Sequence, residues 1–457
     1  MSWSQRQVGD ATDLEVDPTN FDNQYAGIGL RSGGSLNGVY RSMDAGMTWA
    51  RITGPWTTRT GGVGRVELAL APSTPNVVYV SIQDADDGAG HDNGLLGLFK
   101  TTNAWAATAT WEQIPTGATD DGTGVHGYCG YTAAFPSDPF SDQCWYSHVI
   151  MVDPANANVL YAGGVPLWKF DGTNWTEISK TVSDPAHGIH VDQHSMAFAG
   201  RRLIVGNDGG VWSTTDGGST WTDHNTSLAI AQFYDGSLHP TDRDFALAGA
   251  QDNGSVKWMG TNDWQWIDFG DGGDNAISSS NPDTDWMVCR KELNVLRTTN
   301  GGTSFVAADS GIDKANVPFI ARLAKCPAND DVMIAGTDNL WKSTNFFSGT
   351  SASWSSNGPE MTTALSAVAF APSDTTCNTY AFGTGDGTLR LTFDGGANWR
   401  VIDAANAVPN RYVTALAFDP TNANVLYVTL SGFDEGTSGQ PGHLFKTDDA
   451  LGPPPRT

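Results

Sequence analysis

The sequence is short of basic residues, of glutamate and of long apolar runs. It holds 25 Lys and Arg against 50 Asp and Glu, a formal charge of −25, and only seven of the acids are Glu. A nucleic-acid surface needs clustered Lys and Arg, so this composition excludes nucleic acid as a partner. No apolar run approaches the ~18 residues of a membrane-spanning helix. Neutral glycans, basic partners and divalent cations remain compatible, as does a charge that serves solubility alone.

Cysteine is also scarce, and its five positions exclude several kinds of site. The absence of C-x-x-C excludes the thiolate zinc and haem-attachment patterns. Cys129 and Cys144 bracket one loop, which a disulfide would staple in a secreted protein. Cys289, Cys326 and Cys377 fall in or beside expected strands, where we expect buried free thiols.

Turn-forming residues are abundant, with 53 Gly among them, and they separate repeated strands. A short apolar strand ending at a proline corner recurs, with steps of about 42 to 48 residues from Pro240 onward. Such a period suits the four-stranded blade of a β-propeller. The corners lie at Pro18, Pro72, Pro154, Pro240, Pro282, Pro327, Pro372 and Pro420.

A hairpin with the pattern S/T-x-D-x-G-x-T-W recurs in register with these corners. We refer to it as the repeated hairpin; near-complete copies span 42–49, 214–221, 298–305 and 392–399, and degenerate ones lie at 102–111, 171–175, 343–354 and 447–449. The Asp can accept backbone N–H bonds, Gly supplies a positive φ, and the aromatic residue anchors the fourth strand. We therefore interpret its carboxylates as structural.

These repeats predict an all-β fold, a β-propeller of four-stranded blades with about nine repeats (range seven to ten). The last blade is expected to be either incomplete, because the chain is cut within it, or closed by the N-terminal strand around Trp3. We expect one propeller over residues 1–457 with an inserted loop at 115–146 and a fifth unit without the hairpin. The units are 10–52, 63–114, 147–178, 190–223, 229–268, 270–308, 317–356, 363–402 and 412–449.

The repeats, together with the segments 143–146, 190–194, 206–210 and 251–254, resemble the Asp-box (bacterial neuraminidase repeat) superfamily. The chain is most similar to bacterial secreted sortilin-like and "glycosyl hydrolase" propellers. The resemblance implies the fold and an extracellular, periplasmic or cell-surface location. A sialidase arginine triad and the N-terminal pattern of xyloglucanases are missing, so no activity is carried over.

The hairpins also indicate where a ligand site lies. In a blade with strands a to d, the hairpins (c–d) and proline corners (a–b) share one face of the disc, and the b–c and d–a connections share the other. The unusual polar segments at 206–210, 251–254, 190–194 and 270–275 belong to this second face. We therefore expect a site there, near the innermost strands.

Several residues on this face are candidates for metal binding or catalysis. His190, Asp192 and His194 alternate, so on an extended strand they point the same way, and with Asp208 they form a set for calcium or a transition metal. The alternative is a hydrogen-bonded plug. Asp192, Asp252, Asp271 and Asp274 are candidates for the paired carboxylates of glycosidic cleavage. For Asp252 and Asp271, an ordinary role in Gly-rich turns is the alternative.

Other residues are candidates for contacting a ligand. The polar ones are Asn207, Gln251 and Asn253. The aromatic ones, suited to stacking on sugar rings, are Trp145, Tyr146, Tyr128 and Tyr131 in the long loop and Trp258, Trp264 and Trp266 in the fifth unit.

Three functions remain open from the sequence. The first is a secreted glycan-interacting propeller, with glycoside hydrolysis as its catalytic form. The second is a non-catalytic protein- or peptide-binding propeller, as in sortilin-type receptors and assembly factors. The third is a surface structural protein, with calcium as its ion.

Overall fold

The computed structural model describes residues 4–58, 62–85, 93–116, 127–130, 142–180, 188–403, 408–432 and 442–452. In these ranges the chain is all-β apart from three short 3₁₀ turns, η1 (Pro55–Thr58), η3 (Gly127–Cys129) and η4 (Asn225–Ser227). No described helix has the length and apolarity needed to cross a bilayer. The strands fall into two compact units, 1–230 and 231–457.

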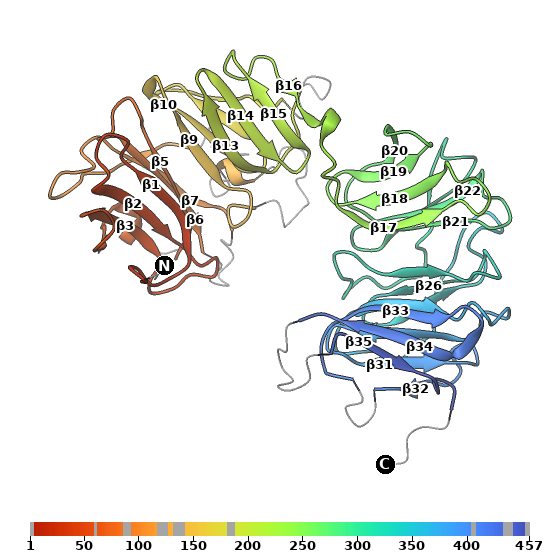
Figure 1. Ribbon diagram of the computed structural model, residues 1–457. Helices are drawn as coiled ribbons and strands as arrows, with labels where there is room; N and C mark the ends of the chain where they lie inside the picture. Colours follow the sequence, from red (N-terminus) through yellow and green to blue (C-terminus); the bar gives the residue numbers. More distant parts are fainter. Residues whose placement is uncertain are drawn as a thin grey trace. The chain divides into compact units, whose positions relative to one another are not determined.

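The first unit contains four sheets of four strands each, in simple meander order (Figure 1). Blade 1 is β1 (Ala11–Val16), β2 (Asn23–Ile28), β3 (Gly38–Met43) and β4 (Ala50–Arg51); blade 2 is β5 (Val63–Leu70), β6 (Val78–Asp84), β7 (Leu95–Thr101) and β8 (Glu112–Ile114); blade 3 is β9 (Val149–Asp153), β10 (Asn156–Gly163), β11 (Leu167–Phe170) and β12 (Trp175–Glu177); blade 4 is β13 (Gln193–Ala199), β14 (Arg202–Asn207), β15 (Gly210–Thr214) and β16 (Thr222–Asp223).

The second unit contains five further sheets of the same kind. Blade 5 is β17 (Phe233–Leu238), β18 (Ala246–Ala250), β19 (Gly254–Trp258) and β20 (Trp264–Asp268); blade 6 is β21 (Gly272–Ile277), β22 (Asp285–Arg290), β23 (Asn294–Thr299) and β24 (Val306–Ala307); blade 7 is β25 (Leu323–Lys325), β26 (Met333–Gly336), β27 (Leu340–Ser343) and β28 (Ser355–Ser356); blade 8 is β29 (Leu365–Phe370), β30 (Tyr380–Thr384), β31 (Leu389–Thr392) and β32 (Arg400–Val401); blade 9 is β33 (Val413–Asp419), β34 (Asn422–Leu430) and β35 (Leu444–Thr447).

The predicted fold class is confirmed: the chain is an all-β propeller protein with nine blades. Every described strand pairs antiparallel with its neighbour in sequence, as expected for four-stranded blades. In blade 9 the described strands number three. That the nine blades form one domain stays a prediction, as does closure by the N-terminal strand, because Trp3 lies outside the described residues.

The apolar core lies between adjacent blades. Tyr79 and Leu98 of blade 2, for example, pack in one cluster with Ile150 and Leu160 of blade 3, and all four side chains are buried. Within each unit, a sheet between two other blades is thereby covered on both faces, which explains why strands such as β6 and β22 read as largely apolar runs. The connections between strands stay at the two ends of the blades, where they are available for other roles.

Side chains on the first strand of a blade also hydrogen-bond to the first strand of the next blade. Oδ2 of Asp13 accepts from Leu68 N at 2.8 Å, and Oδ2 of Asp274 accepts from Leu323 N at 2.7 Å. Ser366 Oγ donates to Val413 O at 2.7 Å. The first strand has one edge without a strand partner, and these side chains satisfy its backbone groups. We call them the inter-blade bonds.

The repeated hairpin has the hydrogen bonds that its sequence indicates. In blade 4, Thr214 Oγ1 donates to Asp216 Oδ1 at 2.7 Å and accepts from Gly218 N at 3.0 Å. Asp216 Oδ1 also accepts from Thr220 N at 2.9 Å, and these contacts lower the pKa of Asp216. The same Thr/Ser-to-Asp/Asn bond closes the copies at 42–49, 298–305 and 392–399 and the degenerate ones beginning at Thr101 and Ser343.

Replacing Thr214 by valine should destabilise blade 4 by about 1–3 kcal/mol, because the buried Gly218 N–H loses its acceptor while the side-chain volume is kept. Urea unfolding followed by tryptophan fluorescence measures this. Thr215→Val, on the neighbouring exposed residue, is the control and should change stability by less than ~0.5 kcal/mol. Equal effects of the two substitutions would contradict the structural role of the hairpin.

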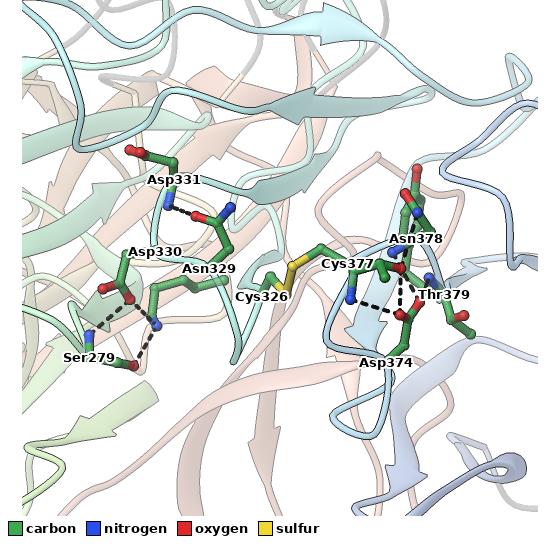
Figure 2. The surroundings of a disulfide bond; sticks show 12 residues. Ser279, Cys326, Asn329, Asp330, Asp331, Asp374, Cys377, Asn378 and Thr379 are labelled. Atoms are coloured by element: carbon green, nitrogen blue, oxygen red, sulfur yellow. Dashed lines mark hydrogen bonds and ion pairs between the residues drawn. A yellow bond between two sulfur atoms is a disulfide. The ribbon is translucent and has the colours of Figure 1, made fainter.

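The cysteines correct one prediction. Cys129 and Cys144, whose pairing the sequence left open, form a disulfide, and Cys289 is a buried free thiol, as expected. Cys326 and Cys377, however, are joined to each other and not free. They lie at the a–b corners of blades 7 and 8, which neighbour each other in space although 51 residues separate the two cysteines (Figure 2).

Both corners joined by this disulfide are further fixed by carboxylates (Figure 2). Asp330 accepts from Lys325 Nζ at 2.6 Å and from Ser279 N at 2.8 Å, which ties blade 7 to blade 6. Asp374 accepts from Thr376 and Thr379, and these bonds hold its pKa at about 2 although burial opposes them. This face of the second unit is therefore a structural one, as the hairpin positions predict.

Candidate functional site

On the opposite face of the first unit, three connections and the start of strand β13 bring charged and aromatic side chains into one row. Arg31, from the β2–β3 turn, places its guanidinium carbon 3.9 Å from the ring centroid of Trp145. The Trp145 and Tyr146 rings are 5.4 Å apart, and the Tyr146 ring lies 4.7 Å from His194, edge to face. His194 Nε2 is 2.7 Å from Asp208 Oδ1. We call these five residues the aromatic row.

The aromatic row is accessible along its length. Tyr146 is 42% exposed and Arg31 is exposed, while Trp145, His194 and Asp208 are partly buried. Its members come from b–c turns, from the connection into blade 3 and from the start of β13. These are the connections that the hairpin argument placed on the ligand face. The sequence did not single out Arg31, although its position in a b–c turn is the signal that identifies it.

The loop that carries Trp145 is anchored on both sides. Cys144 is bonded to Cys129, and its N–H donates to Asn93 O at 3.0 Å. Asn93 Oδ1 in turn accepts from Arg31 Nε at 3.2 Å. Residues 117–126 and 131–141 of the predicted inserted loop, Tyr131 among them, lie outside the described residues, as do residues 86–92 of the β6–β7 connection.

The predicted alternation around His190 is wrong. Strand β13 begins only at Gln193, and Asp192 has a left-handed backbone with φ 64°, so residues 190–192 are not extended. His190 Nδ1 contacts Val191 O, and Asp192 is 8% exposed with its N–H on Val165 O. Of the four candidate metal ligands, the structure joins His194 and Asp208 directly. A metal at this set stays a prediction.

Asn207, a candidate ligand contact, has both ends of its amide in use within blade 4. Its Nδ2 donates to His190 O at 3.0 Å, and its Oδ1 accepts from Gly209 N at 3.1 Å and Trp212 Nε1 at 3.2 Å. Asn207 therefore shapes the turn that carries Asp208. A direct contact with a ligand stays untested.

In the second unit, the candidates near residue 251 form a separate cluster. Asp252, with φ 57°, donates its N–H to Asp271 Oδ1 at 3.0 Å, and Asp271 lies 3.6 Å from Lys291 Nζ. Gln251 Oε1 accepts from the Tyr234 hydroxyl, and Asn253 Nδ2 donates to Gln251 O at 3.0 Å. The structure thus brings Asp252 and Asp271 together, with Asp271 also fixing the turn.

Asp274 lies deeper than the other candidate carboxylates. It is 2% exposed, 2.8 Å from Arg322 Nη1, and provides an inter-blade bond to Leu323. Burial raises its pKa to about 7, against the opposing effect of Arg322. These contacts assign it a structural role between blades 6 and 7.

The remaining aromatic candidates differ in how much of each side chain is exposed to solvent. Tyr128, expected to be exposed, has no exposed surface and packs in the core between blades 2 and 3. Trp264 and Trp266 are 41% and 61% exposed on the fourth strand of blade 5, and Trp258 is partly buried beside Trp264. The long loop thus contributes Trp145 and Tyr146 to the surface and Tyr128 to the interior.

One group of metal-ligand types comes together within the described residues. Cys129, Cys144 and His148 are buried, with donor atoms within 4.8 Å of one another. The two sulfurs are bonded to each other, and burial lowers the pKa of His148 to about 3. A disulfide sulfur is not a thiolate ligand, so this group serves to fix the loop.

Comparison with known proteins identifies fold-level similarity only. No family model and no curated protein matches the chain. Among solved structures, a GH74 enzyme from Niastella koreensis is 16% identical and has a TM-score of 0.32, covering 97% of this chain and 78% of its own. The GH74 xyloglucanase from Xanthomonas campestris is 14% identical with a TM-score of 0.33, covering 96% of this chain and 72% of its own.

YCF48 from Cyanidioschyzon merolae is also 14% identical, with a TM-score of 0.35, and covers 66% of this chain and 96% of its own. At these TM-scores the similarities carry no argument about function. The chain is accordingly described by its own geometry, as a nine-bladed all-β propeller protein with a row of aromatic and charged side chains on one face of its first unit.

Proposed function

We propose that the protein binds carbohydrate through the aromatic row of its first unit. The observation that carries this proposal is the continuous contact from Arg31 through Trp145 and Tyr146 to the His194–Asp208 pair. Aromatic faces bind the apolar C–H faces of sugars, and flanking polar groups fix orientation through hydroxyl hydrogen bonds. The row supplies both kinds of contact on one accessible surface.

The charges at the two ends of the row define which sugar atoms it recognises. Arg31 is exposed and its guanidinium carbon lies 3.9 Å from the centroid of the Trp145 ring, so its terminal N–H groups would supply hydrogen-bond donors to ligand oxygens beside the ring. Asp208 and His194 form a second polar end that both accepts and donates hydrogen bonds. A chain of two or three sugar units matches such an alternation of stacking faces and polar ends.

The proposal includes an extracellular, periplasmic or cell-surface location. Its support is the pair of disulfides, Cys129–Cys144 and Cys326–Cys377, since disulfides persist in oxidising compartments. The first of these disulfides holds the loop that carries Trp145. The binding surface and the location are therefore connected, because reduction would release the loop.

Glycosidic cleavage is a narrower form of the proposal and has less support. It needs two carboxyl groups on either side of the scissile bond. In the aromatic row, the carboxylate is that of Asp208, already bonded to His194, and the Asp252–Asp271 contact lies in the second unit. We therefore propose binding as the primary function, with cleavage as a separate outcome of the test.

The test is isothermal titration with a panel of neutral and acidic oligosaccharides. We expect one class to bind, and we expect Trp145→Ala or Tyr146→Ala to weaken that binding by at least ~10-fold through loss of ring stacking. Trp264→Ala, an exposed tryptophan of the second unit, is the matched control and should leave binding unchanged. Circular dichroism verifies that each variant is folded.

The outcomes separate the alternatives. Absence of binding across the panel, or equal binding by the Trp145→Ala variant, would contradict the proposal. Capture of a protein in place of a sugar would favour the protein- or peptide-binding alternative. Release of reducing sugar, abolished by Asp271→Ala, would establish cleavage.

A further inference from the structure

The side chain of Arg65 binds the backbone of the loop that carries Trp145 and Tyr146. Arg65, on strand β5 of blade 2, donates Nη1 to Tyr146 O at 2.7 Å and to Trp145 O at 3.5 Å, and Nη2 to His148 O at 3.3 Å. Three carbonyls within four residues are thus fixed by one guanidinium. A rigid planar donor group holds several acceptors in a defined relative position, which a lysine cannot do.

The guanidinium is itself fixed by a buried carboxylate. Glu67, two residues along β5 and 7% exposed, accepts from Arg65 Nε at 2.8 Å. The two residues are two positions apart on β5, so the pair is formed within one strand, whose register with β6 shifts between Val63 and Val66. Arg65 therefore has its Nε on Glu67 and its two terminal nitrogens on the loop, and its orientation follows from the strand.

The backbone of Arg65 is also linked to the other end of the row. Gln83 has no exposed surface; its Oε1 accepts from Arg65 N at 2.8 Å and its Nε2 donates to Arg31 O at 3.3 Å. Both the turn that carries Arg31, through Gln83, and the loop that carries Trp145 are thus connected by hydrogen bonds to Arg65 at the start of β5.

From these contacts we infer that Arg65, held by Glu67, is the positioning residue of the aromatic row. It sets where the Trp145 and Tyr146 rings stand relative to Arg31 and His194, without touching the ligand itself. This inference rests on the proposed function for its effect on sugar binding, and on the geometry alone for its effect on the rings. Without Arg65, the disulfide still holds Cys144, but the residues after it lose their fixed carbonyls.

The test measures ring position and binding separately. Protein labelled with 5-fluorotryptophan gives one ¹⁹F resonance per tryptophan, and Trp145→Phe assigns the resonance of Trp145. Arg65→Met should shift or broaden that resonance and weaken binding of the oligosaccharide found above by at least ~10-fold. Arg65→Lys should restore part of both, and Glu67→Gln, which keeps the shape and replaces the carboxyl acceptor by an amide, should give an intermediate effect.

Arg41→Met is the matched control. Arg41 of blade 1 likewise donates to three backbone carbonyls, Ala104 O and Ala106 O at 2.7 Å and Ala107 O at 3.5 Å, but at the face of the repeated hairpins. It should leave the Trp145 resonance and the affinity unchanged. An unaltered Trp145 resonance in folded Arg65→Met would overturn the inference, and so would an equal change in Arg41→Met.

The two proposals fail in different ways. If no sugar binds the wild-type protein but Arg65→Met still displaces the Trp145 resonance, carbohydrate binding is refuted and the positioning role stands. If sugar binds and neither ring position nor affinity responds to Arg65→Met, the reverse holds. Should Arg65→Met not fold, Arg65→Lys and Glu67→Gln are measured in its place, and wild-type behaviour in both refutes the positioning role.

Discussion

A variant with serine at both Cys326 and Cys377 is expected to lose about 4 kcal/mol of unfolding free energy in the second unit. The disulfide closes a loop of 51 residues, and in the chain-entropy account its removal restores that conformational freedom to the unfolded chain. The loss is large because the cross-link joins corners of two different blades. Urea unfolding of wild-type and variant protein, with and without a dithiol reductant, measures it.

Two controls show whether the cross-link is responsible. Cys289→Ala removes a buried sulfur without a cross-link and should not make the protein insensitive to reductant. Serine at Cys129 and Cys144 opens a loop of 15 residues in the first unit, with an expected loss of about 3 kcal/mol there. An unchanged midpoint for the second unit after reduction would refute the assigned role of Cys326–Cys377.

The second large effect concerns pH: the protein should be most stable near pH 5 and lose stability as the pH rises toward 8. Burial raises the pKa of Glu67 to about 8, with Asp13 adding to the shift and Arg65 opposing it, and burial with Asp13 raises the pKa of Glu15 to about 8. Between their unfolded and folded pKa values, the folded state binds more protons than the unfolded one, so the unfolding free energy falls with rising pH.

The size of this loss follows from the shifts. One pKa unit corresponds to about 1.4 kcal/mol, so the two glutamates together should account for at least ~3 kcal/mol between pH 5 and 8. Below pH 4 the sign reverses, because hairpin carboxylates such as Asp216 have lowered pKa values and lose their hydrogen bonds on protonation. Thermal unfolding over this pH range in constant ionic strength gives the complete profile.

Replacing both Glu15 and Glu67 by glutamine removes their carboxyl groups from the titration and so shows how much of the pH dependence they cause. The double variant should lose most of its pH dependence between pH 5 and 8, and the remainder should come from groups such as Asp274, whose pKa burial raises to about 7. Glu112→Gln, an exposed position on β8, should retain the wild-type slope. A wild-type profile that rises steadily from pH 5 to 8 would show that these carboxyl groups are not buried as described.

The blades and the ligand face were predictable from sequence because both depend on local patterns. The hairpin at 214–221 specifies its own hydrogen bonds, and its repetition fixes which connections share a face. The same pattern predicted that Trp145, Tyr146, His194 and Asp208 share one face, and that this face binds a ligand stays a prediction. These side chains can contact one another because the b–c and d–a connections that carry them lie at the same end of the blades.

The errors concern contacts that local pattern does not specify. Cys326 pairs with Cys377 because neighbouring blades place their corners together, a relation invisible along 51 residues. Asp192 leaves the strand pattern because the chain turns there with positive φ before β13 starts. Arg65 and Arg31 were overlooked since long side chains reach partners far away in sequence, as Arg65 reaches the carbonyl of Tyr146.

Three of the inter-blade bonds share a direction along the chain. Asp13 of blade 1 contacts blade 2, Asp274 of blade 6 contacts blade 7, and Ser366 of blade 8 contacts blade 9, so in these three pairs the side chain precedes its partner in the chain. Between blades 5 and 6 a bond also runs the other way, from Asn275 Nδ2 to Asp235 O. During synthesis, blades 1, 6 and 8 therefore already present the side chain to which the first strand of the following blade binds.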